Sequence, residues 1–171
     1  HPSNAKRLQE NLERNGIEAR VVQKALSDEA GEVSLAVAVE SHTTSPGHNL
    51  VELNDSVKEY GQNSAEKVTT EMTKGDDLIE TKGLPSPTIL KIDVEGAELN
   101  VLRGLEKTLR RDDCELVYCE VHTDHLPKFG GSESELYGLL KSYGFSIEQL
   151  DDHNNKHHIK AVKYTDDSST K

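Results

Sequence analysis

The chain has 171 residues, enough for one domain with a sizeable core, and 33% of them are hydrophobic. Its 31 acidic and 20 basic residues give a net charge of −11, so nucleic acids and anionic membranes are poor partners. No apolar run of the sequence approaches the roughly 18 residues that span a bilayer. A solvated surface explains the acidity, with adaptation to high salt as the alternative. The two cysteines fit a reduced, cytoplasmic protein.

The N-terminal part of the chain is predicted to hold one helix followed by short strands. Ala5, Leu8 and Leu12 share one helical face. Ser3 can cap the start of this helix, and Gly16 can end it. Alternating apolar residues predict the strands. In order, the expected elements are a helix over residues 4–15, strands over 17–25 and 33–39, a long loop over 41–67, a short strand over 68–72 and a helical turn over 73–79.

The C-terminal part alternates strands and helices. Ser132 and Glu135 form a capping box, and Gly144 ends the helix that this box begins. Because strands that alternate with helices form parallel sheets, the predicted class is α/β, with a mostly parallel sheet and an antiparallel C-terminal hairpin. In order, the expected elements are a strand over residues 88–94, a helix over 97–110, a strand over 115–121, a helix over 133–143 and a hairpin of 145–150 with 157–164.

Acidic residues and a histidine stand where two of the predicted strands end. Asp93 and Glu95 lie at the end of the first strand, and Glu120 and His122 lie at the end of the next. Ligands of an open α/β sheet bind beyond the carboxyl ends of its strands, so both pairs are expected at one edge. Asp93 and Glu120 are hard to explain as structural residues, because strand ends seldom need carboxylates. For His122, functional and structural explanations are balanced.

Other residues near these strand ends have a structural interpretation. Glu98 falls near a helix N-terminus, where the helix dipole favours an anion. Lys91, inside a strand, is explained equally well by an ion pair and by a functional role. The remaining histidines of the C-terminal part fit loop or hairpin positions, and these are His125, His153, His157 and His158.

An acidic sheet edge of this kind supports three kinds of chemistry. Its oxygens, with a histidine, can bind a divalent cation. A carboxylate or histidine can act as a general base toward a hydroxyl. Carboxylates can also hold the polar parts of a cationic cofactor or a sugar. The spacing of the residues does not choose among these alternatives.

The most specific motif is LKIDVEGAE over residues 90–98, followed by VLRG over 101–104. Four further segments agree with the same family pattern: HPSN over 1–4, KALSD over 24–28, CEVH over 119–122 and GLLKSYGF over 138–145. On these residues the chain resembles the FkbM-type methyltransferases from about residue 1 to 164, with residues 165–171 as a polar tail. The resemblance implies a single domain with a Rossmann-like methyltransferase sheet.

The resemblance also implies an activity and a cofactor. Members of the family transfer a methyl group from S-adenosyl-L-methionine, usually to a hydroxyl, so the implied reaction is O-methylation of a small-molecule or sugar acceptor. Such an enzyme aligns the acceptor oxygen and helps to remove its proton. The segment around residue 27 matches the family loop that flanks the adenine. The catalytic candidates are then Asp93, Glu95, Glu120 and His122, and the cofactor-binding candidates are Leu26, Ser27, Asp28 and Asp93.

The family pattern also begins with a strand and an Asp-x-Gly-Ala-Asn-x-Gly type loop that cradles the cofactor, and neither precedes His1. We therefore expect either that a further N-terminal segment supplies this loop or that the chain is a truncated, non-catalytic remnant. Such a remnant would act as an interaction module and form homo-oligomers through exposed strand edges. The third alternative is a metal-dependent enzyme that uses Asp93, Glu120 and His122 on a polar or sugar substrate.

Overall fold

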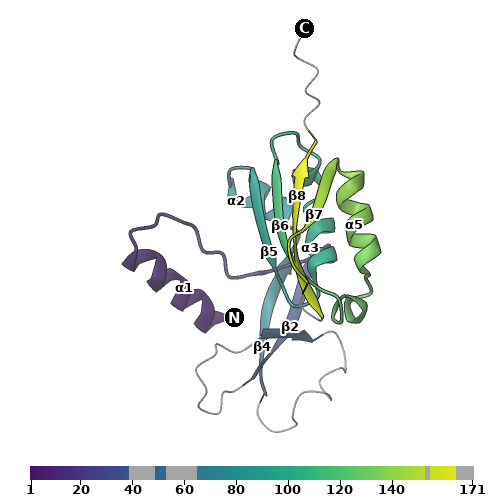
Figure 1. Ribbon diagram of the computed structural model, residues 1–171. Helices are drawn as coiled ribbons and strands as arrows, with labels where there is room; N and C mark the ends of the chain where they lie inside the picture. Colours follow the sequence, from purple (N-terminus) through teal and green to yellow (C-terminus); the bar gives the residue numbers. More distant parts are fainter. Residues whose placement is uncertain (39–48, 53–64, 153–154, 165–171) are drawn as a thin grey trace. The chain divides into compact units, whose positions relative to one another are not determined.

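The computed structural model describes residues 1–38, 49–52, 65–152 and 155–164. The chain divides into two compact units. Unit 1 comprises His1–Ala25 and Ala30–Met72, and unit 2 comprises Leu26–Glu29 and Thr73–Lys171. Two four-stranded sheets are present, with the strand orders β1-β4-β2-β3 and β5-β6-β8-β7 (Figure 1). None of the described helices is long and apolar enough to cross a membrane.

Unit 1 begins with the predicted helix, α1 (Pro2–Arg14). The cap is His1 and not Ser3, because the helix begins two residues earlier than expected, at a proline whose fixed φ suits the first turn. The His1 ring accepts a hydrogen bond from the Ser3 backbone N–H at 3.3 Å. The strands that follow are β1 (Ala25–Leu26), β2 (Gly31–Ala38), β3 (Asn49–Glu52) and β4 (Ala65–Thr73).

Two predictions for this part of the chain are wrong. Residues 17–24 form no strand, and only Ala25–Leu26 of the predicted strand is β1. An apolar pattern does not itself supply the partner that strand N–H and C=O groups need. The expected loop over residues 41–67 contains β3 and the start of β4, because β2 pairs antiparallel with both strands. The rest of that loop lies outside the described residues.

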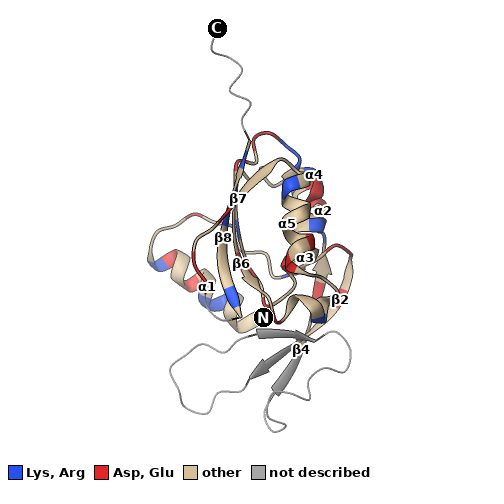
Figure 2. Cartoon of the chain, turned by 45° about the vertical axis from the view of Figure 1, so that its right-hand side comes forward, with Lys and Arg blue, Asp and Glu red and all other residues tan. Residues whose placement is uncertain are grey.

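Unit 2 is a sheet whose described helices cover one face (Figure 2). The predicted strands and helices are present with ends shifted by at most three residues, except that the helix over 97–110 is divided in two. The strands are β5 (Ile89–Asp93), β6 (Leu116–His122), β7 (Phe145–Gln149) and β8 (Lys156–Lys163). The helices are α2 (Gly75–Lys82), α3 (Glu98–Gly104), α4 (Glu106–Leu109) and α5 (Glu133–Ser142), with a 3-10 turn η2 (Leu126–Phe129).

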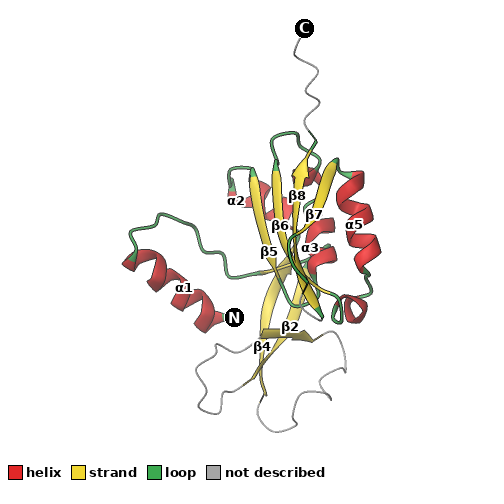
Figure 3. Ribbon diagram, viewed as in Figure 1, coloured by secondary structure: helices red, strands yellow, loops and turns green. Residues whose placement is uncertain are grey.

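The sheet of unit 2 is mixed. Strands β5 and β6 run parallel, whereas β8 lies antiparallel between β6 and β7. The antiparallel C-terminal hairpin is therefore confirmed (Figure 3). The expectation of a mostly parallel sheet is wrong for these four strands, because the hairpin returns its second strand to the free side of β6. The protein is a mixed α/β protein.

The core of unit 2 lies between the sheet and its helices. Val117, Cys119 and Val121 alternate along β6 and point to the helices, where Leu102 and Leu109 meet them. The two cysteines are free, and both are fully buried. This core fixes β6 and α3 against each other, and these two elements carry the residues described next.

The predicted helix over residues 97–110 is divided in two at Leu105. Asp76 of α2 accepts hydrogen bonds from the backbone N–H groups of Lys107 and Thr108, at 2.7 and 3.0 Å. These bonds satisfy the free N–H groups at the start of α4, so the chain begins a second helix there. Local apolar spacing predicts one continuous helix, since the interrupting side chain comes from another element.

Candidate functional site

Two turns meet at the carboxyl ends of β5 and β6, an edge of the sheet that we call the rim. The sheet register places Asp93, the last residue of β5, beside Glu120 of β6. Between β5 and α3 the chain passes through Gly96, with φ of 104°. A Cβ atom at this position would lie 2.6 Å from the Cβ of His125 in the turn after β6. Only glycine allows this conformation and this approach, so the motif glycine brings the two turns together.

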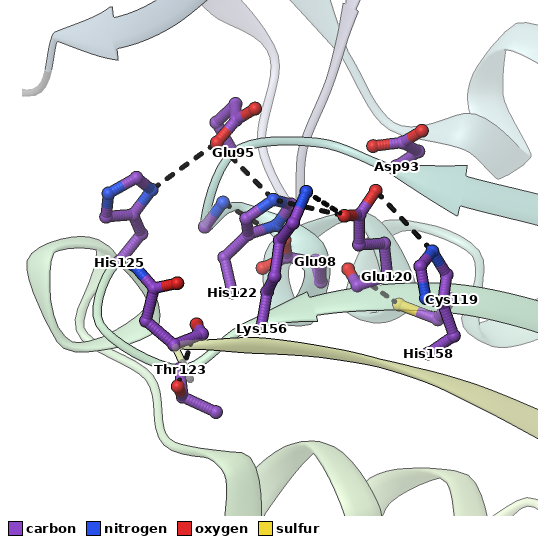
Figure 4. A network of polar contacts seen from close by, with 12 residues as sticks. Asp93, Glu95, Glu98, Cys119, Glu120, His122, Thr123, His125, Lys156 and His158 are labelled. Atoms are coloured by element: carbon purple, nitrogen blue, oxygen red, sulfur yellow. Dashed lines mark hydrogen bonds and ion pairs between the residues drawn. The ribbon is translucent and has the colours of Figure 1, made fainter. Parts of the chain in front are cut away.

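His122 is at the centre of the rim (Figure 4). Its Nδ1 lies 2.7 Å from Glu98 Oε1, and its Nε2 lies 3.4 Å from Glu95 Oε2 and 4.0 Å from Glu120 Oε1. The hydrogen bond to Glu98 raises the pKa of His122, against the opposing effect of burial, and the three nearby carboxylate charges raise it further. The structure thus gathers Glu95, Glu98 and Glu120 around the imidazole of His122.

Glu98 is the first residue of α3, as its helix-start interpretation expects, but it also contacts His122. Its side chain is fully buried. Its Oε1 accepts a second hydrogen bond, from the Gly96 backbone N–H at 3.1 Å. Its Oε2 has no hydrogen-bond partner among the described residues. The sequence interpretation missed the contact with His122, and the available signal was the glutamate two residues after the motif glycine.

Glu120 connects the rim to β8. Its Oε1 lies 2.5 Å from the Lys156 ammonium, and its Oε2 lies 3.8 Å from His158 Nε2. His158 Nδ1 in turn lies 2.8 Å from Asp151 Oδ2. Sequence reasoning did not select Lys156 and His158, because they reach Glu120 only through the insertion of β8 beside β6.

Asp93 lies at the more exposed side of the rim. Its Oδ2 is 2.5 Å from the Lys91 ammonium. Of the two explanations given for Lys91, the ion pair is therefore the one that matches its contact. The hydrogen bond to this ammonium lowers the pKa of Asp93, against partial burial. A pocket of about 330 Å³ adjoins these strands, and its lining includes Lys91, Tyr118, Glu120 and His158.

His125 also belongs to this cluster. Its ring stacks on that of His122, with 5.9 Å between centroids and 10° between planes. Its Nδ1 lies 3.6 Å from Glu95 Oε2. The expected loop position is correct, since His125 lies in the turn after β6. The spacing of three residues from His122 across a tight turn was the signal for this contact.

Leu26, Ser27 and Asp28 lie at the opposite end of α3 from Glu98. The Ser27 carbonyl oxygen would be 2.0 Å from a Cβ atom at Gly104, the last residue of α3. The Ser27 hydroxyl donates to Asp28 Oδ1 at 3.1 Å, and Leu26 packs against the core of unit 2. The length of α3 therefore separates these three cofactor candidates from the histidine cluster.

Metal-binding geometry is absent from the described part of the chain. Across residues 1–38, 49–52, 65–152 and 155–164, no group of three or more His, Cys, Asp or Glu side chains could hold a metal ion. The oxygens and nitrogens at the rim bind one another and Lys156 instead. The arrangement fits proton transfer and the binding of polar or cationic groups.

Comparisons with known proteins agree with the motif. The family model of the methyltransferase FkbM domain matches residues 1–147. The hexuronic acid methyltransferase AglP of Haloferax volcanii is 40% identical over 72 residues, which cover 39% of this chain and 29% of that protein. The 31-O-demethyl-FK506 methyltransferase FkbM of Streptomyces tacrolimicus is 26% identical over 162 residues, which cover 82% of this chain and 58% of that protein.

The chain thus spans less than two thirds of the length of either relative. No solved structure matches it significantly. The family match nevertheless covers most of the sequence, including all of unit 1, unit 2 as far as residue 147 and the entire rim from Asp93 to His125. The chain belongs to the FkbM methyltransferase domain family.

Proposed function

We propose that the protein transfers a methyl group from S-adenosylmethionine to a hydroxyl oxygen of a small molecule or sugar. The observation that carries this proposal is the imidazole of His122, held among carboxylates at the carboxyl ends of two parallel strands. This edge is where α/β sheets bind their ligands. Membership of the methyltransferase family supports the same reaction class.

The donor set at the rim fits the charge of the proposed cofactor. S-adenosylmethionine carries a cationic sulfonium and a cationic ammonium, and Asp93 and Glu95 present carboxylates beside the start of α3. When bound, the cofactor supplies a methyl group activated by the positive sulfur. Asp93 is our candidate for the methionine end. Leu26, Ser27 and Asp28 stay candidates for the adenine end on the family pattern alone.

In this proposal His122 is the general base. Its Nε2 accepts the proton of the acceptor hydroxyl, and a raised pKa makes the neutral imidazole a stronger base. Glu120 is already oriented by Lys156 and is suited to bind a second hydroxyl of the acceptor. The adjoining pocket of about 330 Å³ is of the size that small-molecule sites have.

The names of the two relatives guide the choice of acceptor. One is named for hexuronic acid and the other for 31-O-demethyl-FK506, which specifies an oxygen as the demethylated position. Both acceptors carry hydroxyl groups, and carboxylates such as Glu120 bind sugar hydroxyls through charge-assisted hydrogen bonds. Hexuronic acids are therefore the first acceptors to test.

The test uses the natural full-length protein. Calorimetry with S-adenosylhomocysteine should give a micromolar Kd, and labelled methyl groups should pass from S-adenosylmethionine to a glucuronic or galacturonic acid acceptor. Asp93→Asn should weaken binding about tenfold, the effect of one lost charge-assisted contact. Glu148→Gln, a matched change at an exposed residue of β7, should leave binding unchanged. The absence of both binding heat and transfer to any hydroxylated acceptor would contradict the proposal.

One feature favours the alternative of an interaction module. Ile89, Leu116 and Val162 lie side by side across three strands, on the face opposite the helices, and Ile89 and Val162 are 59% and 39% exposed. A second copy of the chain could cover this row. Light scattering of the natural full-length protein tests this, since a dimer that Ile89→Thr dissociates would support the module, and a monomer would count against it.

A further inference from the structure

The two ring nitrogens of His122 have different surroundings. Nδ1 points inward, to a carboxylate that is fully buried, at 2.7 Å. Nε2 points to the rim, where the nearest carboxylate, Glu95, lies 3.4 Å away with its side chain 23% exposed. Figure 4 shows His122 between Glu98 and Glu95. One nitrogen is thus bonded inside the protein, and the other is presented where an acceptor would bind.

We propose that Glu98 is a positioning residue, which holds His122 in the tautomer with its proton on Nδ1 and so leaves Nε2 to act at the rim. The chemical reason is that an ionised carboxylate only accepts hydrogen bonds, so the nitrogen that faces it must donate. The assignment of Nε2 to proton transfer rests on the function proposed above. The hydrogen bond from Nδ1 to Glu98, which fixes the tautomer, is independent of that function.

Glu98 is itself held in place, as a positioning residue must be. Its Oε1 accepts from the Gly96 backbone N–H at 3.1 Å, and its side chain has no solvent exposure. Gly96 is fixed in turn, because its φ of 104° and its approach to His125 admit no side chain. The motif glycine and the motif glutamate therefore act together, since the turn made by one directs an N–H group at the other.

The groups that face His122 come from every neighbouring element. Glu95 lies in the turn before α3, Glu98 begins α3, Glu120 is on β6, and His125 stacks on the ring from the turn after β6. Lys156 is opposite His122 in the register of β8, but its ammonium contacts Glu120. The bond to Glu98 is the largest of the influences that raise the pKa of His122.

The tautomer can be read directly by nuclear magnetic resonance. In the ¹⁵N-labelled full-length protein, long-range ¹H–¹⁵N correlations distinguish a proton on Nδ1 from one on Nε2, and His122→Gln assigns the signal. We expect neutral His122 to carry its proton on Nδ1. In Glu98→Gln the pKa of His122 should fall by about one unit or more, because a hydrogen bond to a charged partner is replaced by a neutral one.

A matched control is available at a second buried histidine. Glu133 Oε1 lies 3.5 Å from His157 Nε2, so Glu133→Gln removes a carboxylate beside a histidine without touching the rim. This variant should leave the pKa of His122 unchanged. In Glu98→Gln, an unchanged His157 signal reports that the fold is intact.

Two results would overturn the positioning role: a wild-type neutral His122 with its proton on Nε2, or a folded Glu98→Gln protein with an unaltered His122 pKa. If Glu98→Gln does not fold, the wild-type tautomer decides alone. Cofactor binding is judged separately by calorimetry. If His122 carries its proton on Nδ1 but the protein binds no S-adenosylhomocysteine, the positioning role of Glu98 is supported and the proposed function is rejected. If the proton is on Nε2 and the protein does bind S-adenosylhomocysteine, only the positioning role is rejected.

Discussion

Two buried histidines on adjacent strands of the same sheet have opposite surroundings. His122 on β6 is 5% exposed and His157 on β8 is 4% exposed. His122 bonds a buried carboxylate and has two more carboxylates within 4.0 Å. His157 Nε2 instead meets the Tyr137 hydroxyl at 2.8 Å, with Glu133 at 3.5 Å. Burial therefore does not distinguish the proposed base from His157, whereas the bonded partners of the two rings differ.

The position of each histidine in the sheet explains the difference. His157 pairs in register with Val121, which points to the helices, so its ring fills the space between β8 and α5. The hydroxyl of Tyr137 on α5 satisfies it there. His122 ends its strand, where the turn through Gly96 brings acidic side chains to it. The ring of His157 thus connects β8 to α5, whereas the ring of His122 presents its Nε2 at the rim.

The largest predicted effect separates the two histidines by activity. His122→Gln should lower kcat for methyl transfer about 100- to 10,000-fold, the range over which a general base contributes. His157→Gln should leave kcat within about twofold of wild type once folding is verified by circular dichroism. Both are measured with labelled S-adenosylmethionine and a hexuronic acid acceptor. Equal losses of kcat in the two variants would show that the different surroundings of His122 and His157 do not matter for methyl transfer.

The second effect is on the pH dependence of stability. The pKa of His122 is raised in the folded state above its usual value of 6.5. The stabilisation from this group is therefore fully present below the unfolded pKa and is lost as the pH rises through the folded pKa. Glu98→Gln should reduce the free energy of unfolding by about 1.5–3 kcal/mol at low pH, as expected for a hydrogen bond to a charged group.

Urea denaturation at about pH 5.5 and about pH 8.5 checks this linkage. The difference between wild type and Glu98→Gln should be larger at the lower pH. The same substitution in a His122→Gln background serves as the control, since its cost should no longer depend on this histidine. A difference that widens at the higher pH would contradict the direction of the pKa shift.

Local sequence pattern was sufficient for most of unit 2. Strand β5, the glycine turn and the start of α3 follow from an apolar run, a glycine and three- to four-residue spacing, all of which are local signals. The same reasoning failed at Leu105, where Asp76 caps a second helix from 31 residues away. It also failed over residues 17–24, where apolar character occurs without a strand partner.

In the candidate site, too, local sequence pattern predicts some residues and misses those whose contacts depend on packing. Residues at strand ends, such as Asp93 and Glu120, can be selected from sequence because parallel strands place their carboxyl ends together. The partner of His122 cannot be selected in this way. Glu98 and His122 are 24 residues apart, and their contact depends on how α3 packs against β6. The helix-dipole interpretation of Glu98 predicted its position at the start of α3 but not its contact with His122.

The smallest predicted effect is on the structural histidine. Tyr137→Phe removes the hydroxyl that bonds His157 and should cost about 1 kcal/mol of unfolding free energy, the usual contribution of a neutral hydrogen bond. Burial raises the pKa of Tyr137, so the hydroxyl stays protonated and the bond is present throughout the pH range in which the enzyme would be assayed. Denaturation in urea measures the cost, and the methyl-transfer rate should not change. A slower reaction in this variant would mean that the contact between β8 and α5 affects the rim, because β8 carries both His157 and the Lys156 that binds Glu120.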